Sequence, residues 1–135
     1  MDRVLEHLAI GDARDGLRPD PQVTALLCVA AELAPPAARA VAHQVPIVDM
    51  QPIPARQLAE AVEWIAGHVR RQTILVYCNA GVGRSSSVVI AYLYLHRAMG
   101  FGGAVEQVAE RHPFMSLLPG LLPTLKALRR APDGY

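Results

Sequence analysis

One cysteine, one arginine and one serine stand within a short segment, and their order and spacing suit nucleophilic attack on a bound oxyanion. Arg84 follows Cys78 by six positions, and Ser85 comes directly after the arginine. A thiol forms the reactive thiolate most readily near a helix N-terminus and a cationic side chain. The planar guanidinium of an arginine can hold two oxygens of one anion. We predict that Cys78 is a nucleophile and that Arg84 faces the same anion.

The residues between Cys78 and Arg84 could form a cradle for that anion. Gly81 and Gly83 permit positive φ angles and a close approach of the backbone. The N–H groups of such a loop attract an anion, and so does the N-terminus of a helix that follows it. No Lys-Ser or Lys-Thr pair follows the last glycine, which excludes a Walker-type nucleotide loop. We expect phosphate to bind at Asn79, Ala80, Gly81, Val82, Gly83 and Arg84.

The pattern of apolar residues predicts the elements that position this loop. Short apolar and β-branched runs predict strands over residues 4–10 (one or two strands), 25–29, 45–48 and 73–77. Helical spacing predicts helices over residues 12–17, 54–71, 84–100, 104–111 and 121–130. Gly102-Gly103 separates the third of these helices from the fourth, and Pro35-Pro36 opens either a loop or a helix. Strands alternate with helices early and helices dominate late, which is typical of an α/β domain. We expect a central, mostly parallel sheet of about four to five strands flanked by helices.

Length and composition narrow the class of protein. The 135 residues favour a single domain over residues 1–135. The net charge of +1 disfavours a nucleic-acid-binding protein, and no apolar run approaches the ~20 residues that span a membrane. Two cysteines and an N-terminus without a signal peptide favour a cytoplasmic setting. The five histidines have no metal-binding spacing, so we expect neither a metal nor a cofactor. The oligomeric state is left open.

The segment from Cys78 to Ser85 resembles the Cys-x5-Arg-Ser/Thr signature of the protein tyrosine phosphatase superfamily, in particular that of the small atypical dual-specificity phosphatases. The stretches LAIGDARD, ALLCVAAE, VPIVD and AYLYLHRAMGFGGAVEQVAERHP resemble further parts of that family. The resemblance implies a reaction in two steps, without a metal, through a phosphocysteine intermediate. Cys78 would be its nucleophile and Arg84 its phosphate clamp, while Ser85 would help Cys78 to leave.

The resemblance also implies a general acid and base. Asp49 ends the VPIVD stretch and is 29 residues before Cys78, so it would protonate the leaving oxygen and later activate water. An ordinary role in a turn or a helix cap is the alternative for Asp49, as a helix start is for Ser85. Asp12 and Asp15 are the next candidates for the acid.

Two positions raise separate questions. The family usually has histidine immediately before the nucleophile, where this chain has Tyr77. Either the tyrosine hydroxyl takes over the ordering of the loop, or the thiol loses some reactivity. Cys28 lies in a predicted buried strand, where it either packs in the core or serves as a redox partner that traps oxidised Cys78 as a disulfide.

We therefore expect a hydrolase that acts on phosphoproteins, on phosphotyrosine and also on phosphoserine and phosphothreonine. One alternative is a phosphatase of a phospholipid or another small phosphate ester. The uncharged interior of the loop, from Asn79 to Gly83, disfavours polyphosphorylated inositol lipids but not simpler esters. A non-catalytic phospho-binding module is an alternative of another class. Sulfur transfer and arsenate reduction use similar anion loops, but the Gly-x-Gly-Arg-Ser pattern favours the phosphatase.

Overall fold

A five-stranded sheet forms the frame of the structure, a computed structural model that describes residues 1–36 and 41–130. Its strands follow the order β1-β2-β5-β3-β4. β1 pairs with β2 in antiparallel fashion, and all other neighbours are parallel. The mostly parallel sheet predicted from the sequence is thus confirmed. The strands are β1 (Asp2–Leu5), β2 (Leu8–Gly11), β3 (Ala25–Cys28), β4 (Ala42–Gln44) and β5 (Ile74–Tyr77).

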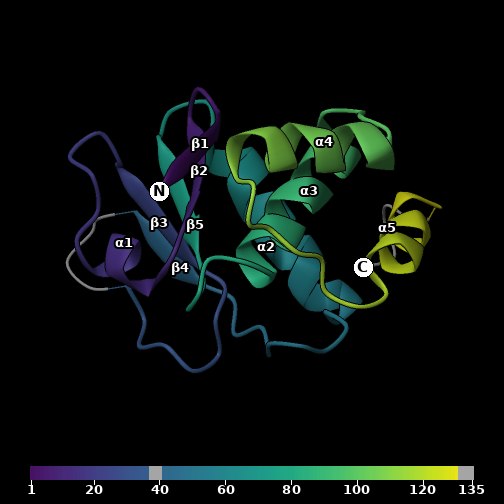
Figure 1. Cartoon of the computed structure of the whole chain (residues 1–135), viewed down its shortest axis with the longest axis horizontal. Helices are drawn as coiled ribbons and strands as arrows, with labels where there is room; N and C mark the ends of the chain where they lie inside the picture. Colours follow the sequence, from purple (N-terminus) through teal and green to yellow (C-terminus); the bar gives the residue numbers. More distant parts are fainter. Residues whose placement is uncertain (37–40, 131–135) are drawn as a thin grey trace.

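Helices cover both faces of this sheet. Figure 1 shows α2, α3, α4 and α5 gathered on one side and α1 by the other. α3 lies in the middle of the helical layer and is buried from Arg84 to Tyr94. Its residues from Val88 onward are apolar almost all round, which suits burial on most faces. In the described ranges, no helix is long and apolar enough to cross a membrane. The helices are α1 (Ala13–Leu17), α2 (Ala55–His68), α3 (Arg84–His96), α4 (Phe101–Arg111) and α5 (Leu121–Arg130).

The strand predicted over residues 45–48 is wrong, because β4 lies just before it. Val45 and Ile47 are fully buried, which produces the apolar pattern of a strand. The N–H of Val45 still donates to the carbonyl of Cys28 at 2.9 Å. Pro46 has no N–H to continue the ladder, and the N–H of Ile47 turns back to the carbonyl of Val45 at 2.8 Å. The segment therefore leaves the sheet while its apolar side chains stay in the core.

Three predicted helix boundaries are also corrected. Gly102 and Gly103 do not separate two helices but lie inside the first turn of α4, since burial of Ala104 and Val108 outweighs the ~1 kcal/mol that each glycine costs. α2 ends at His68 and α3 at His96, each a few residues early. No helix begins at Pro35-Pro36, and residues 37–40 lie outside the described residues.

The register of the parallel strands brings three chain segments to one edge of the sheet. Tyr77 at the end of β5 pairs with Gly11 at the end of β2 and with Cys28 at the end of β3. The loops that follow these strands therefore start side by side. Ligands of open α/β sheets bind at this carboxyl edge.

The contact of α1 with β5 generates a test of this packing. A Cβ atom on Gly16 would lie 2.4 Å from the Tyr77 ring. We expect Gly16→Ala to lower the free energy of unfolding by ~1–3 kcal/mol, because the ring must move. Gly67→Ala in α2 is the matched control, since nothing lies within 4 Å of its Cβ position, and it should be neutral or stabilising. Urea denaturation measures both, and equal stability of the two variants would contradict the packing.

Candidate active site

The loop from Cys78 to Gly83 joins β5 to α3 and contacts the turn after β2. The N–H of Ala13 donates to the carbonyl of Asn79 at 3.0 Å. Gly81 has a φ of 73°, which favours glycine. A Cβ atom on Gly81 would lie 2.9 Å from the carbonyl oxygen of Gly11. Only glycine therefore allows this loop to curl so closely against its neighbour.

The segment after α4 holds the loop from the other side. The N–H of Ser116 donates to the carbonyl of Val82 at 2.9 Å. His112 bridges two acceptors, because its Nε2 lies 2.5 Å from the carbonyl oxygen of Gly81 and its Nδ1 lies 2.6 Å from a carboxylate oxygen of Asp2. The loop is thus fixed to β1 as well as to α1.

Cys78 and Ser85 meet where the loop enters α3. The Cys78 thiol is almost fully buried, and its Sγ lies 3.3 Å from the hydroxyl oxygen of Ser85. No side chain caps the N-terminus of α3 at Gly83. The N–H groups of its first turn are therefore available to an anion beside the thiol.

Arg84 is held rigidly by an acidic residue that the sequence analysis missed. Its two terminal nitrogens donate to the two carboxylate oxygens of Glu32, each at 2.5 Å. One of them also donates to the carbonyl of Ile47 at 3.0 Å. The hydrogen bonds with Arg84 lower the pKa of Glu32 to about 2 and, in turn, raise the pKa of Arg84. The guanidinium is only 2% exposed, so this pairing offsets the cost of burying its charge.

One nitrogen of Arg84 is left without a hydrogen bond. Its Nε is buried and has no acceptor within the described ranges. A carboxylate oxygen of Asp49 lies 3.7 Å away, within ion-pair but not hydrogen-bond distance, and accepts the N–H of Met50 at 2.9 Å. A buried donor without a partner costs free energy, which a bound anion would recover. The arginine is therefore prepared to bind an anion through Nε.

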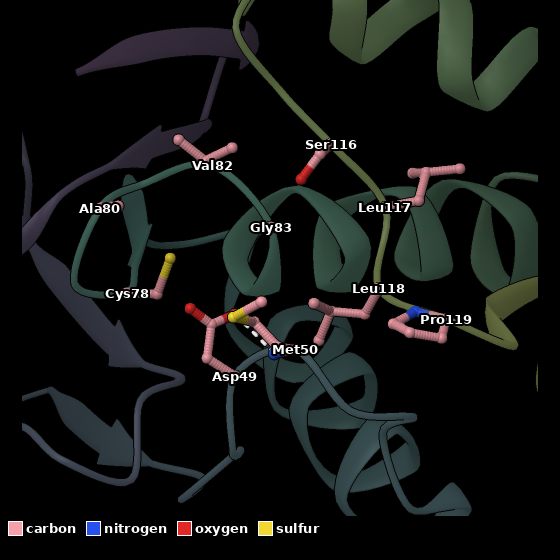
Figure 2. A pocket seen from close by; sticks show the side chains of 10 residues that line it. All are labelled: Asp49, Met50, Cys78, Ala80, Val82, Gly83, Ser116, Leu117, Leu118 and Pro119. Carbon is pink, nitrogen blue, oxygen red and sulfur yellow. Dashed lines mark hydrogen bonds between the residues drawn. The ribbon is translucent and has the colours of Figure 1, made fainter.

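Cys78 and Asp49 open onto the same cavity, which has a volume of about 330 Å³. In Figure 2 the sulfur of Cys78 and the carboxylate of Asp49 lie close together at one end of this cavity. Of the predicted site residues, the structure thus brings together Cys78, Ser85, Arg84 and Asp49. The cavity is lined by Asp49, Met50, Cys78, Ala80, Val82, Gly83, Ser116, Leu117, Leu118 and Pro119.

The alternative acids are engaged elsewhere. Asp12 accepts the N–H of Asp15 at 3.0 Å and so caps α1, while Asp15 accepts the N–H of Asp12 in return. The hydrogen bond from the Asp15 backbone lowers the pKa of Asp12. Neither carboxylate lines the cavity of Cys78. The geometry therefore favours Asp49 over both of them.

Tyr77 and Cys28 lie next to the loop but interact with each other. They are register partners on β5 and β3, and their side chains lie close enough for the Cys28 thiol to contribute to raising the pKa of Tyr77. Burial raises the pKa of both groups. Within the described residues the Tyr77 hydroxyl makes no hydrogen bond to the loop, so it does not take the place of the family's histidine. Both cysteines are free thiols, and a redox role for Cys28 stays a prediction.

Glu32 is the site residue that sequence reasoning missed. It ends the ALLCVAAE stretch, just after a predicted strand, so its place at the carboxyl edge of the sheet was a usable signal. For His112, which lies in the stretch ending in AERHP, the resemblance implies a structural role in a turn. Its contacts with Asp2 and Gly81 span 110 and 31 positions, so no local pattern predicts those partners.

Comparisons with known proteins give a consistent result. Residues 24–131 match the family described as dual specificity phosphatase, catalytic domain. The chain is 36% identical over 76 residues to dual specificity protein phosphatase MPK-4 of Drosophila melanogaster, which covers 56% of this chain and 20% of that protein. It is 42% identical over 48 residues to phosphatidylglycerophosphate phosphatase PTPMT2 of Arabidopsis thaliana, which covers 36% of this chain and 21% of that protein. The matches thus span about a fifth of each relative's length.

A solved structure extends the likeness to nearly the whole chain. The crystal structure of human DUSP28 superposes with a TM-score of 0.85 at 26% sequence identity, over 98% of this chain and 98% of that chain.

The Glu32–Arg84 pair generates a prediction about acid stability. The pKa of Glu32 is about 2 in the folded protein against an ordinary value of 4.5, so the pair stabilises the folded state above pH 4.5 and this contribution is lost as the pH falls towards 2. The Glu32 side chain is 44% exposed, so solvent reduces the effect. We expect the free energy of unfolding, measured in urea, to fall less steeply over this range in Glu32→Gln than in the wild type. Glu110→Gln, on the exposed side of α4, should keep the wild-type slope. Equal slopes for all three proteins would contradict the pairing.

Proposed function

The chain belongs to the dual-specificity phosphatase family, and from this we propose that it hydrolyses phosphate monoesters on proteins, with Cys78 as the nucleophile. Phosphotyrosine is the leading substrate, and phosphoserine and phosphothreonine are further ones. The observation that carries the proposal is the Nε of Arg84, which among the described residues has no hydrogen-bond acceptor and is buried at the end of a loop that begins with the Cys78 thiol. We also propose a cytoplasmic location, because the reaction requires a reduced thiol and both cysteines are free.

Binding of the phosphate follows from the charges at the loop. The backbone N–H groups of the loop and of the first turn of α3 attract the phosphate oxygens. Arg84 adds its Nε, while Glu32 and the carbonyl of Ile47 hold the rest of the guanidinium in place. Positioning and charge stabilisation of this kind dominate the catalysis of phosphoryl transfer.

In the first step, the Cys78 thiolate attacks phosphorus on the side opposite the leaving oxygen. The S–P bond forms as the P–O bond breaks. Asp49, in its protonated form, gives its proton to the leaving oxygen, so the dephosphorylated hydroxyl departs neutral. The position of Asp49 on the same cavity as Cys78 supports this role.

In the second step, water attacks phosphorus, and the Asp49 carboxylate takes its proton. The S–P bond breaks, and inorganic phosphate and the Cys78 thiolate are released. Ser85 donates a hydrogen bond to the departing sulfur, a role supported by the 3.3 Å between its Oγ and the Cys78 Sγ. Asp49 ends the cycle protonated, ready for the next substrate.

A phospholipid or another small phosphate ester is the second candidate substrate. The similarity to PTPMT2 of Arabidopsis thaliana supports it, although it covers only 36% of this chain. The loop residues between Cys78 and Arg84 include no lysine or arginine that could hold additional phosphates. This candidate therefore takes the form of a simple monoester rather than a polyphosphorylated lipid.

The first prediction of this proposal concerns the nucleophile. We expect the wild type to release p-nitrophenol from p-nitrophenyl phosphate in the presence of a chelator and a reductant, and Cys78→Ser to release none above background. Cys28→Ala is the matched control, since it removes a second buried thiol that does not line the cavity, and it should retain turnover. Turnover by Cys78→Ser would refute the thiol mechanism. Inactivity of the wild type would favour the phospho-binding module.

The second prediction concerns the acid. Asp49→Asn should lower kcat by ~10²–10⁴-fold, the usual contribution of general acid catalysis, while binding of inorganic phosphate as a competitive inhibitor is retained. Asp12→Asn is the control, because asparagine caps a helix as well as aspartate does and the rate should stay near that of the wild type. A wild-type rate in Asp49→Asn would remove Asp49 from the mechanism.

A further inference from the structure

Two exposed apolar side chains line the Cys78 cavity, and two more belong to residues near its lining in the sequence. Within the described ranges, the large hydrophobic residues that are exposed number six: Met1, Leu17, Val48, Met50, Phe114 and Leu117. Met50 and Leu117 line the cavity itself. Val48 precedes Asp49, and Phe114 lies two positions before Ser116. Asp49 and Ser116 both line the cavity. We name Val48, Met50, Phe114 and Leu117 the apolar rim.

Met50 is held at this rim in an unfavourable backbone conformation. Its φ is 61°, a region that costs a non-glycine residue of order 1–2 kcal/mol. Its N–H nevertheless stays bonded to the carboxylate of Asp49 at 2.9 Å, and its side chain is 83% exposed. In Figure 2 this side chain lies beside Asp49 at the cavity. Strain that persists beside a reactive site, with an apolar group in water, indicates a binding function.

The lining of the cavity offers negatively charged groups next to the phosphate no favourable partner. Val82, Leu118 and Pro119 provide apolar walls, and Asp49 is the one charged residue in the lining. A second, smaller cavity shares Ala80 with the first and is lined by Asp2, Asp12 and Asp15. Each of these carboxylates already has a partner: Asp2 lies 2.6 Å from His112, Asp12 lies 3.7 Å from Arg14 and Asp15 lies 3.3 Å from the N-terminal amine. Among the described residues, the lining of the first cavity contains no basic side chain that could attract an acidic group next to the phosphate.

We propose that the apolar rim binds apolar side chains next to the phosphorylated tyrosine of a protein substrate. This inference rests on the proposed function and specifies its substrate. The loop fixes the position of the phosphate, and the cavity of about 330 Å³ with apolar walls accepts the aromatic ring. The residues on either side of the tyrosine then come to lie on the rim. The enzyme thereby selects phosphotyrosine with apolar neighbours over phosphotyrosine with small polar ones.

The experiment compares kcat/KM for two phosphotyrosine peptides that differ only in the residues flanking the tyrosine, leucine in one and serine in the other. We expect the wild type to prefer the leucine-flanked peptide by about tenfold, the scale of a small apolar contact. The preference should fall towards one in Met50→Asn and in Leu117→Asn. Asparagine tolerates the backbone of Met50, so that variant retains the local fold.

Two further variants make the test specific. Leu17→Asn is the matched control: Leu17 is 79% exposed and lines a different cavity, beside Tyr77, so the preference should not change. Phe114→Ser changes a side chain that is 87% exposed, so it should fold normally and lower the preference. An equal loss of preference in Leu17→Asn would overturn the assignment to the rim.

The remaining outcomes separate this inference from the proposed function. Thiol-dependent turnover of p-nitrophenyl phosphate without any preference between the peptides would overturn the inference and leave the function standing. Absence of all turnover would overturn the function, and the inference with it. Faster turnover of phosphatidylglycerophosphate in anionic vesicles than of either peptide would overturn the inference in favour of a lipid surface.

Discussion

The site depends on keeping one guanidinium charged and oriented inside the protein. Arg84 is buried at the start of α3, and a buried charge is tolerated only when it is paired and hydrogen-bonded. Glu32 after β3 and the carbonyl of Ile47 before Asp49 supply those partners. The same bonds tie both segments to the start of α3. The interaction that stabilises the arginine therefore also assembles the site.

The parallel sheet explains why these segments meet. Tyr77, Gly11 and Cys28 end neighbouring strands in register, so the loops after β5, β2 and β3 begin at one edge. The loop of Cys78 is the central one and leans on Gly11, where only a glycine at position 81 fits. A long, buried α3 then continues from the loop into the helical layer. Hydrogen bonds from Ala13 on one side and from Ser116 on the other hold the loop in this curled shape.

Charged groups and apolar side chains occupy different parts of the cavity. The charged groups, Arg84 and Asp49, lie next to the thiol, where a phosphate would bind. Around them the lining is apolar and extends onto exposed side chains such as Met50 and Leu117. Such a site binds the phosphate through charge and the rest of its substrate through burial of apolar surface. The two functions use different residues, so the selectivity can change without changing the chemistry.

The sequence by itself determined the local parts of this protein. Cys78, Arg84 and Ser85 lie within one strand–loop–helix unit, whose geometry follows from nearby glycines and apolar runs. Those runs also predicted β3 and β5, and one or two strands where the structure has β1 and β2. Only the tertiary structure decided that Glu32 pairs with Arg84, 52 positions away, and that His112 holds Gly81. It also moved β4 ahead of Pro46 and turned the Tyr77 hydroxyl to Cys28. These contacts depend on strand register and on the competition of many distant groups for the same space, which no local pattern of residues records.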